Sequence, residues 1–436
     1  RTWFDQAAST ILARVEQDRS TWQSWHLRSE ALRLVRGNGV PPAHTDAVVN
    51  WLTNQVLTEH SIPLTPDGDG IEEPPELRRS DGASVYTVAG NKLYTSTRML
   101  EAEQRLVRVA GRHDGRTVPE TGVDLALLET TANGVELNNG QALLVREMAS
   151  SGARLQLAIA PAGAGKTTAM HALSRAWANG GGTVIGLAPS AVAAAGLGEQ
   201  IDGTADTIAK LAWHLEHGGA PRWVNQIGPE TLVIIDEAGM ADTLSLDTVI
   251  THILNAGGSV RLIGDDQQLA AIGAGGVLRD IEATHGALRL SELVRFTDPA
   301  EGSASLALRE GQPEALGFYL DRERIRVGNQ ETMADQLFTA WAADRAAGRD
   351  SVMLAPTREL VADLNQRARS HRLNGTSPGA VVELADGNTA SCGDVIITRH
   401  NDRRLRLNAT NWVKNGDRWT ISSITNAGVR ARHTQS

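Results

Sequence analysis

The sequence predicts an α/β fold whose centre is a doubly wound parallel sheet. Short apolar runs rich in β-forming residues alternate with helical stretches through the middle of the chain. This alternation is typical of parallel strands covered by helices on both faces. The most informative run is LAIAPAGAGKTT at 157–168. It leads from an apolar strand through a glycine-rich turn into a helix with one apolar face, so we expect the sheet to be organised around it.

Further strands and helices follow this unit in order. Strand-like runs occur at 183–189 (TVIGLAP), 231–237 (TLVIIDE) and 259–266 (SVRLIGDD). Helical runs at 190–200 and 208–215 separate the first two of these strands. Sheets of this kind bind ligands at the carboxyl ends of their strands, so polar residues that end a strand are the candidates for chemistry.

The turn after the first strand has the residue types of a phosphate-binding loop. Small residues allow backbone N–H groups to close around phosphate oxygens, and the positive end of the following helix adds to the attraction. Lys166 is expected to reach the β- and γ-phosphates of a nucleotide, and Thr167 to bind Mg²⁺. Ala160 stands where the usual pattern has its first glycine, which removes the freedom to take a positive φ. The predicted nucleotide contacts are Pro161, Ala162, Gly163, Ala164, Gly165, Lys166, Thr167 and Thr168.

Polar side chains end two of the later strands. Asp236 is expected to hold Mg²⁺ through water, and Glu237 to orient and deprotonate an attacking water. After the next strand, Gly264 and Asp265 are followed by Gln268, whose amide is placed to sense the γ-phosphate. The spacing of Gly264, Asp265 and Gln268 indicates, among proteins with a phosphate-binding loop, the motors that act on nucleic acid.

A polar residue before the first strand is a further candidate. Residues 137–148 (LNNGQALLVREM) predict a helix capped by Asn138 or Asn139, with Gln141 near its start. A glutamine amide can bind an adenine edge with its donor and its acceptor. An ordinary surface glutamine is the alternative, and only its position relative to the phosphate loop favours the adenine role.

Composition excludes several classes of protein. The chain of 436 residues carries 42 Lys and Arg against 51 Asp and Glu, a net charge of −9. This net charge argues against a protein that binds nucleic acid over its whole surface, but it is compatible with a local basic groove. The one cysteine, Cys392, excludes an internal disulfide framework and favours a reducing, cytoplasmic compartment. No apolar run approaches the roughly 18 residues of a membrane span, so no membrane partner is expected.

The regions that flank the sheet predict smaller units. Helical periodicity in residues 1–60 predicts three short helices, and alternation in 85–96 around Gly90 and Asn91 predicts a hairpin, which together suggest a winged-helix-like region. Residues 351–369 predict another strand, turn and helix. Short β-strands are expected from 393 to 424. Four arginines in this stretch have two possible roles, a phosphate-binding patch or a solvated strand face. They are Arg399, Arg403, Arg404 and Arg406.

Taken in order, these motifs resemble those of a known family. Gln141, PAGAGKTT, APSAVAAAGL, TADTIAKL, IDEAGM, GDDQQL and ELVRF are similar to the motifs of superfamily 1 DNA helicases of the RecD-like branch. The likeness is greatest to the helicase part of conjugative relaxase-helicases of the TraI/TrwC (MobF) type, and it covers most of the chain beyond about residue 93. It implies a motor that uses ATP and Mg²⁺, moves 5′ to 3′ on single-stranded DNA, and has conjugation or repair proteins as further partners.

The resemblance implies roles that the residues alone do not assign. Arg295 in ELVRF matches an arginine that touches the γ-phosphate from the second motor domain, so it joins Lys166, Glu237 and Gln268 as a catalytic residue. The resemblance also implies a set of DNA-binding residues: Pro189, Ser190, Thr204, Thr207, Thr357 and Arg358. For the hydroxyl groups among them, a role as an ordinary helix cap is nearly as good an explanation as a contact with DNA.

The resemblance also sets the expected domain organisation. Residues 1–136 would form the N-terminal region and 137–294 a first RecA-like lobe that binds ATP. Residues 295–436 would form a partial second RecA-like lobe with the start of an SH3-like β insertion. The Gln-Gly motif and the further arginine motif of the family cannot be found before Ser436. We therefore expect a truncated chain that binds nucleotide, hydrolyses ATP weakly or not at all, and does not unwind DNA.

Two other functions remain open. A RecD-like repair helicase subunit would share the same motifs. A motor-derived DNA-binding or docking module would keep the fold without unwinding DNA. The second alternative is disfavoured because the residues with chemical roles are all present: Lys166, Thr167, Asp236, Glu237, Gln268 and Arg295. An upstream relaxase domain with clustered His and Tyr would separate conjugation from repair.

Overall fold

The computed structural model describes residues 2–64, 74–79, 84–85, 92–265, 267, 276–407, 412–426 and 428–434. The chain divides into two compact units, residues 1–297 and 298–436. The predicted limit between the lobes, after residue 294, lies close to this division. None of the described helices is long and apolar enough to cross a membrane.

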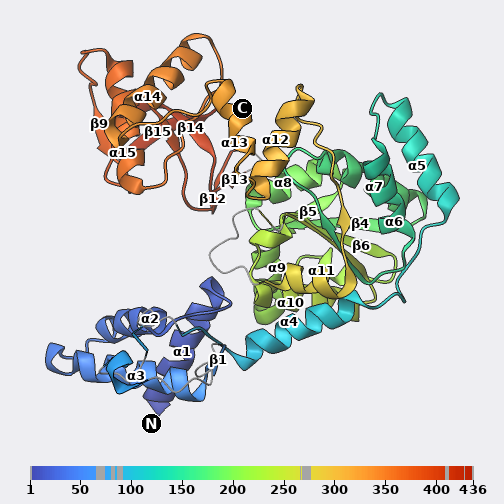
Figure 1. Cartoon of the computed structure of the whole chain (residues 1–436), viewed down its shortest axis with the longest axis horizontal. Helices are drawn as coiled ribbons and strands as arrows, with labels where there is room; N and C mark the ends of the chain where they lie inside the picture. Colours follow the sequence, from blue (N-terminus) through green and yellow to red (C-terminus); the bar gives the residue numbers. More distant parts are fainter. Residues whose placement is uncertain are drawn as a thin grey trace. The chain divides into compact units, whose positions relative to one another are not determined.

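Six parallel strands of the described chain form the sheet of the first unit (Figure 1). Across the sheet their order is β5 (Thr204–Thr207), β4 (Thr183–Ala188), β6 (Thr231–Ile235), β7 (Ser259–Gly264), β3 (Leu155–Ile159) and β8 (Leu288–Arg289). β3 comes first in the chain yet lies between β7 and β8, which come last. The strand that carries the glycine-rich loop is therefore enclosed by two neighbours, and the predicted strands and parallel sheet are confirmed.

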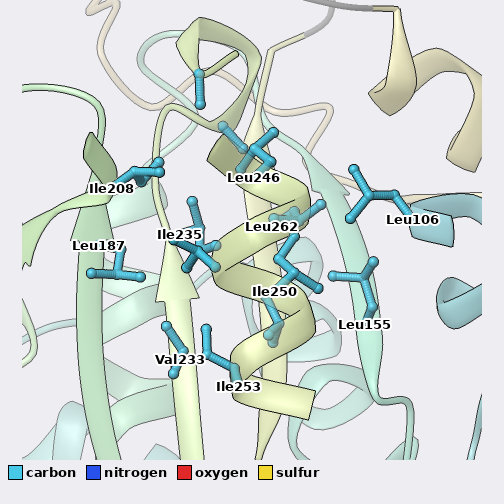
Figure 2. Close-up of a cluster of buried hydrophobic side chains, with 14 of the residues drawn as sticks. Leu106, Leu155, Leu187, Ile208, Val233, Ile235, Leu246, Ile250, Ile253 and Leu262 are labelled. Atoms are coloured by element: carbon cyan, nitrogen blue, oxygen red, sulfur yellow. The ribbon is translucent and has the colours of Figure 1, made fainter. Parts of the chain in front are cut away.

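Helices cover both faces of this sheet and complete three layers. On one face lie α4 (Thr97–Ala110), α9 (Ile208–His217), α10 (Thr243–Asn255) and α11 (Val277–His285). On the other lie α5 (Glu120–Ala132), α6 (Asn139–Ser150), α7 (Lys166–Asn179) and α8 (Ala191–Gln200). Figure 2 shows how α10 packs: Leu246, Ile250 and Ile253 face the sheet residues Ile235 and Leu262. Their spacing of four and three residues places them on one stripe of the helix.

A charged side chain lies buried in the middle of the sheet. Arg261 on β7 donates to the carbonyl of Met148 at 2.7 and 2.9 Å and to that of Ala153 at 2.8 Å. Met148 lies in the last turn of α6, where carbonyls have no partner within the helix. The guanidinium therefore caps the carboxyl end of α6. Burial lowers the pKa of Arg261 to about 9, which leaves it charged at neutral pH.

Replacing Arg261 with methionine is expected to destabilise the first unit by roughly 2–6 kcal/mol. Methionine fills much of the same space but leaves two buried carbonyls without donors, and each costs about 1–3 kcal/mol. Urea unfolding followed by tryptophan fluorescence measures the change. The control is Arg279→Met at an exposed position of α11, which should alter stability by less than about 0.5 kcal/mol. Equal midpoints for the two variants would show that the guanidinium does not hold α6.

The described part of residues 2–60 forms the three predicted helices. These are α1 (Thr2–Asp18), α2 (Ser24–Gly37) and α3 (Pro42–Glu59), which share a core that includes Ile11, Trp22 and Leu52. The short strand β1 (Ile62–Pro63) then pairs with β2 (Tyr94–Thr95) in antiparallel register. Half of the predicted hairpin at 85–96, including its turn at Gly90 and Asn91, lies outside the described residues.

The second unit combines helices with short antiparallel sheets. Its helices are α12 (Pro299–Arg309), α13 (Ala315–Asp321), α14 (Gln330–Ala346) and α15 (Arg358–Leu373). β9 (Val381–Glu383) pairs with β10 (Thr389–Ser391), and β12 (Asp402–Arg406) pairs with β13 (Trp412–Val413). β14 (Arg418–Thr425) lies between β11 (Val395–Ile397) and β15 (Gly428–His433). The β-rich stretch expected from residue 393 is confirmed in this antiparallel form.

One predicted strand of the second unit is not formed. α15 begins at Arg358 as the sequence predicts, but residues 351–355 adopt no strand, and Val352 and Leu354 are 75% and 81% exposed. A parallel strand needs neighbours to pair with and helices to bury its side chains. No described strand of this unit pairs with these residues. The described part of the second unit therefore lacks the parallel sheet that a second RecA-like lobe requires.

Candidate active site

The loop between β3 and α7 adopts a conformation that favours glycine. Gly163 and Gly165 have φ values of +87° and +74°, a region that other residues rarely enter. A Cβ added at Gly163 would lie 2.8 Å from the Cβ of Arg295, and one added at Gly165 would lie 2.1 Å from Nε2 of Gln141. Ala160 is not among the residues with positive φ, so alanine in place of the first glycine causes no backbone strain.

The backbone of this loop offers donors for phosphate. Among the described residues, no backbone acceptor engages the N–H groups of Gly163, Gly165 or Lys166. Lys166 is the first residue of α7, so the positive end of that helix lies at the same place. These donors fit the phosphates of a nucleotide.

Two further strands end at the same edge of the sheet as the loop. Ile159 of β3 pairs with Gly264 of β7, and Ile235 of β6 pairs with Leu262 of β7. The turn after β6 lies against the end of β7, because a Cβ added at Gly264 would come within 3.3 Å of the Gly239 nitrogen. Asp236 and Glu237 begin this turn, so the predicted carboxylates and the predicted phosphate loop share one edge.

Glu237 has a strained backbone. Its φ is +52°, which is uncommon for a residue with a side chain and typical of functional sites. Its N–H donates to Oδ1 of Asp236 at 2.8 Å, and the 3₁₀ turn η3 (Ala238–Met240) follows directly. The N–H of Asp236 donates to Leu187 O at 3.0 Å, which extends the pairing of β6 with β4. The two carboxylates are thus positioned by the end of the sheet itself.

Gln141 lies beside the phosphate loop. Its Nε2 donates to the carbonyls of Gly165 at 3.1 Å and Ala164 at 3.4 Å. Its Oε1 accepts from the Asn138 N–H at 2.9 Å, while Asn138 Oδ1 accepts from the Gln141 N–H at 2.8 Å, a capping box at the start of α6. Gln141 is only 3% exposed. The predicted position beside the loop is found, and the predicted adenine contact stays a prediction.

The chain passes the phosphate loop again after β8. Leu290 donates its N–H to Ile159 O at 3.0 Å, and Val294 donates to Gly163 O at 2.9 Å. The next residue, Arg295, lies against Gly163. Arg295 belongs to the first unit, whereas the resemblance implied an arginine supplied by the second motor domain. The sequence did not predict a role for Val294, because it contributes its backbone N–H, which no sequence motif indicates.

The predicted DNA-binding residues lie at three places in the fold. Ala188 at the end of β4 pairs with Thr207 at the end of β5, so Pro189, Ser190 and Thr207 lie at the same edge as the phosphate loop. Thr204 lies at the other end of β5. Thr357 and Arg358 belong to the second unit. Ser190, Thr207 and Thr357 each cap a helix, accepting from the N–H of Ala193, Lys210 and Leu360.

The predicted γ-phosphate sensor Gln268 lies outside the described residues. Its neighbour Asp265 is buried and accepts from the Gln267 N–H at 3.1 Å. Among the described residues no group of three or more His, Cys, Asp or Glu side chains could hold a metal ion. The predicted Mg²⁺ ligands Thr167 and Asp236 stay a prediction.

Two features together define a P-loop NTPase domain. One is a glycine-rich loop with backbone donors that follows a central parallel strand, and the other is a carboxylate pair at the same edge of the sheet. Residues 136–330 match a family described as an AAA domain (AAA_30). The match includes the loop, the carboxylates and the segment that carries Arg295.

The chain is also similar to proteins of conjugal transfer. It is 30% identical over 348 residues, 76% of its length, to the conjugal transfer protein TraA of Rhizobium radiobacter. It is 28% identical over 351 residues, 78% of its length, to the TraA protein of Agrobacterium fabrum strain C58. It is 30% identical over 276 residues, 62% of its length, to a probable TraA protein of Sinorhizobium fredii. The chain spans only 30%, 31% and 24% of these relatives. Of the predicted resemblance, one part is confirmed: the chain contains a P-loop NTPase domain and has distant similarity to TraA.

Proposed function

We propose that this chain is the motor part of a conjugative relaxase-helicase, which hydrolyses ATP and moves 5′ to 3′ on single-stranded DNA. One observation carries the proposal: the phosphate loop and the Asp236–Glu237 pair meet at one edge of the sheet, in a chain similar to TraA over most of its length. The similarity to proteins of conjugal transfer favours conjugation over the repair alternative.

In the proposed reaction each residue has a distinct role. The N–H groups of Gly163, Gly165 and Lys166 bind the phosphates, and the Lys166 ammonium neutralises charge that develops on the γ-phosphate. Glu237 orients a water molecule and takes its proton as the water oxygen attacks the γ-phosphorus and ADP leaves. Mg²⁺, held by Thr167 and Asp236 together with the nucleotide, would supply further positive charge at the phosphates. Arg295 lies beside Gly163 and adds a guanidinium to the same site.

The proposed DNA path follows the same edge of the sheet. Ser190 and Thr207 use their oxygens as acceptors in helix caps, but a hydroxyl that accepts one hydrogen bond still has its proton to donate. The capping geometry fixes the oxygen while the proton remains available to a DNA phosphate. Helix capping and DNA binding are therefore compatible at these positions.

The test measures ATP binding and hydrolysis with and without single-stranded DNA, and unwinding of duplexes with a 5′ or a 3′ overhang. A longer natural chain that contains residues 1–436 should hydrolyse ATP faster with DNA and unwind only the 5′-overhang substrate. Residues 1–436, whose described second unit has no parallel sheet, should bind ATP but hydrolyse it weakly and unwind neither substrate. DNA binding by the longer chain without any ATP binding would favour the docking module and contradict the proposal.

A further inference from the structure

An exposed tryptophan lies on α9, the helix that begins at the proposed DNA path. Trp213 is 53% exposed, whereas Trp22 and Trp177 of the same chain are fully buried. The opposite side of α9 packs into the core through Ile208 and Leu211. The indole therefore lies on a helix that is anchored to the sheet, and its exposure does not come from a loosely packed segment.

Two histidines hold this indole in place. The His217 ring stacks on it, with centroids 4.7 Å apart and planes 10° apart, and the His214 ring packs edge-on at 5.1 Å. Nδ1 of His217 lies 2.9 Å from the carbonyl of Trp213, and Nδ1 of His214 lies 3.3 Å from that of Gly218. Because both rings are fixed by the backbone, the indole loses little conformational freedom when a ligand binds to it.

The position of Trp213 connects it with the proposed DNA path. Thr207 caps α9 and lies at the same edge of the sheet as Ser190. Trp213 follows Thr207 by six residues, which is about 9 Å at the rise of an α-helix. Ala209, four residues before Trp213, is exposed on the same stripe of the helix and is too small to cover the indole. A strand whose phosphate is bound at Thr207 therefore has an open path to the indole for one of its bases.

The charges beside Trp213 favour a base over a phosphate as the group that it contacts. Residues three positions away on either side are its neighbours on the helix surface. Lys210 is paired with Asp206, and Glu216 is an exposed carboxylate. Every residue of α9 is described, and the helix has no other lysine or arginine to bind a phosphate. Stacking needs no such charge, because every base has a π-face.

We propose that Trp213, supported by His217, is a stacking platform for an unpaired base of single-stranded DNA. This inference rests on the proposed function, because the platform extends the DNA path proposed at Ser190 and Thr207. It adds a contact with the bases to a path made of hydroxyl and backbone groups. The platform should accept any base and should contribute nothing to the binding of a strand that has none.

The test compares a mixed-sequence oligonucleotide with an abasic strand of the same length and backbone charge. Fluorescence anisotropy measures their binding to the longer natural chain that contains residues 1–436, at about 0.2 M salt, which weakens contacts with the backbone. Trp213→Ala should weaken binding of the mixed-sequence strand about tenfold and leave binding of the abasic strand within about twofold of wild type. Trp213→Phe keeps an aromatic face and should restore most of the lost affinity. The matched control is Trp25→Ala, which removes an indole of similar exposure, 55%, from α2 and should change neither affinity.

Two results would overturn the inference. One is wild-type affinity of Trp213→Ala for both strands. The other is an equal loss of affinity for both strands, because the indole would then contact the backbone or support the fold. The proposed function would survive either result as long as single-stranded DNA still stimulates ATP hydrolysis. A wild-type chain that does not bind the mixed-sequence strand would overturn the proposed function and this inference with it.

Discussion

Replacing Lys166 with alanine is expected to abolish DNA-stimulated ATP hydrolysis, a loss of roughly a thousandfold. Lys166 is the first residue of α7 and is only partly buried, so its removal deprives the phosphates of a point charge without opening a cavity in the core. Steady-state ATPase assays of the longer natural chain with saturating single-stranded DNA measure the effect.

The matched control for Lys166 lies on the same helix. Arg175 is an exposed cation of α7, and Arg175→Ala should leave turnover within about twofold of wild type. Both variants should unfold at the wild-type temperature. Full turnover in Lys166→Ala would remove the basis for assigning the loop to nucleotide.

Changing Glu237 to glutamine should separate binding from chemistry. The amide cannot take a proton from water, so ATP hydrolysis should fall by about a hundredfold or more, while ATP affinity stays near that of wild type. The substitution keeps a side chain of the same length on the strained backbone, so the turn after β6 is preserved. Single-turnover hydrolysis and equilibrium ATP binding are the two measurements.

Glu199, an exposed carboxylate on α8, provides the control for Glu237. Glu199→Gln removes the same charge from the same unit and should change neither quantity. If Glu237→Gln lost affinity and turnover to the same extent, the role of Glu237 would be to support the turn rather than to act as a base.

The elements of the first unit could be predicted because their signals are local. An apolar run such as that of β6 indicates a buried strand wherever it pairs, and the spacing around Lys166 indicates a phosphate loop by itself. The strand expected at 351–355 shows the limit of this reasoning. Its apolar residues carry the same local signal as β6, but the pattern does not report whether a partner strand exists.

The surroundings of the loop could not be predicted because they depend on chain segments that return from far away. β8 has only two residues, too few for a strand pattern, yet it leads Val294 and Arg295 to Gly163. Gln141 follows Asn138 by three residues, a capping-box spacing that was available in the sequence and would have indicated that its oxygen is occupied. The loop carbonyls that occupy its NH₂ group became visible only in the folded chain.

The order of the strands has a consequence for how the chain folds during synthesis. Residues of β3 pair with residues 260–264 and 288–289, more than a hundred positions further along the chain. Contacts of such long range slow folding, and the ribosome adds only about 5–20 residues per second. The apolar strand that leads into the phosphate loop therefore stays without its partner strands for several seconds after it emerges, and during that time its unpaired edges are open to aggregation.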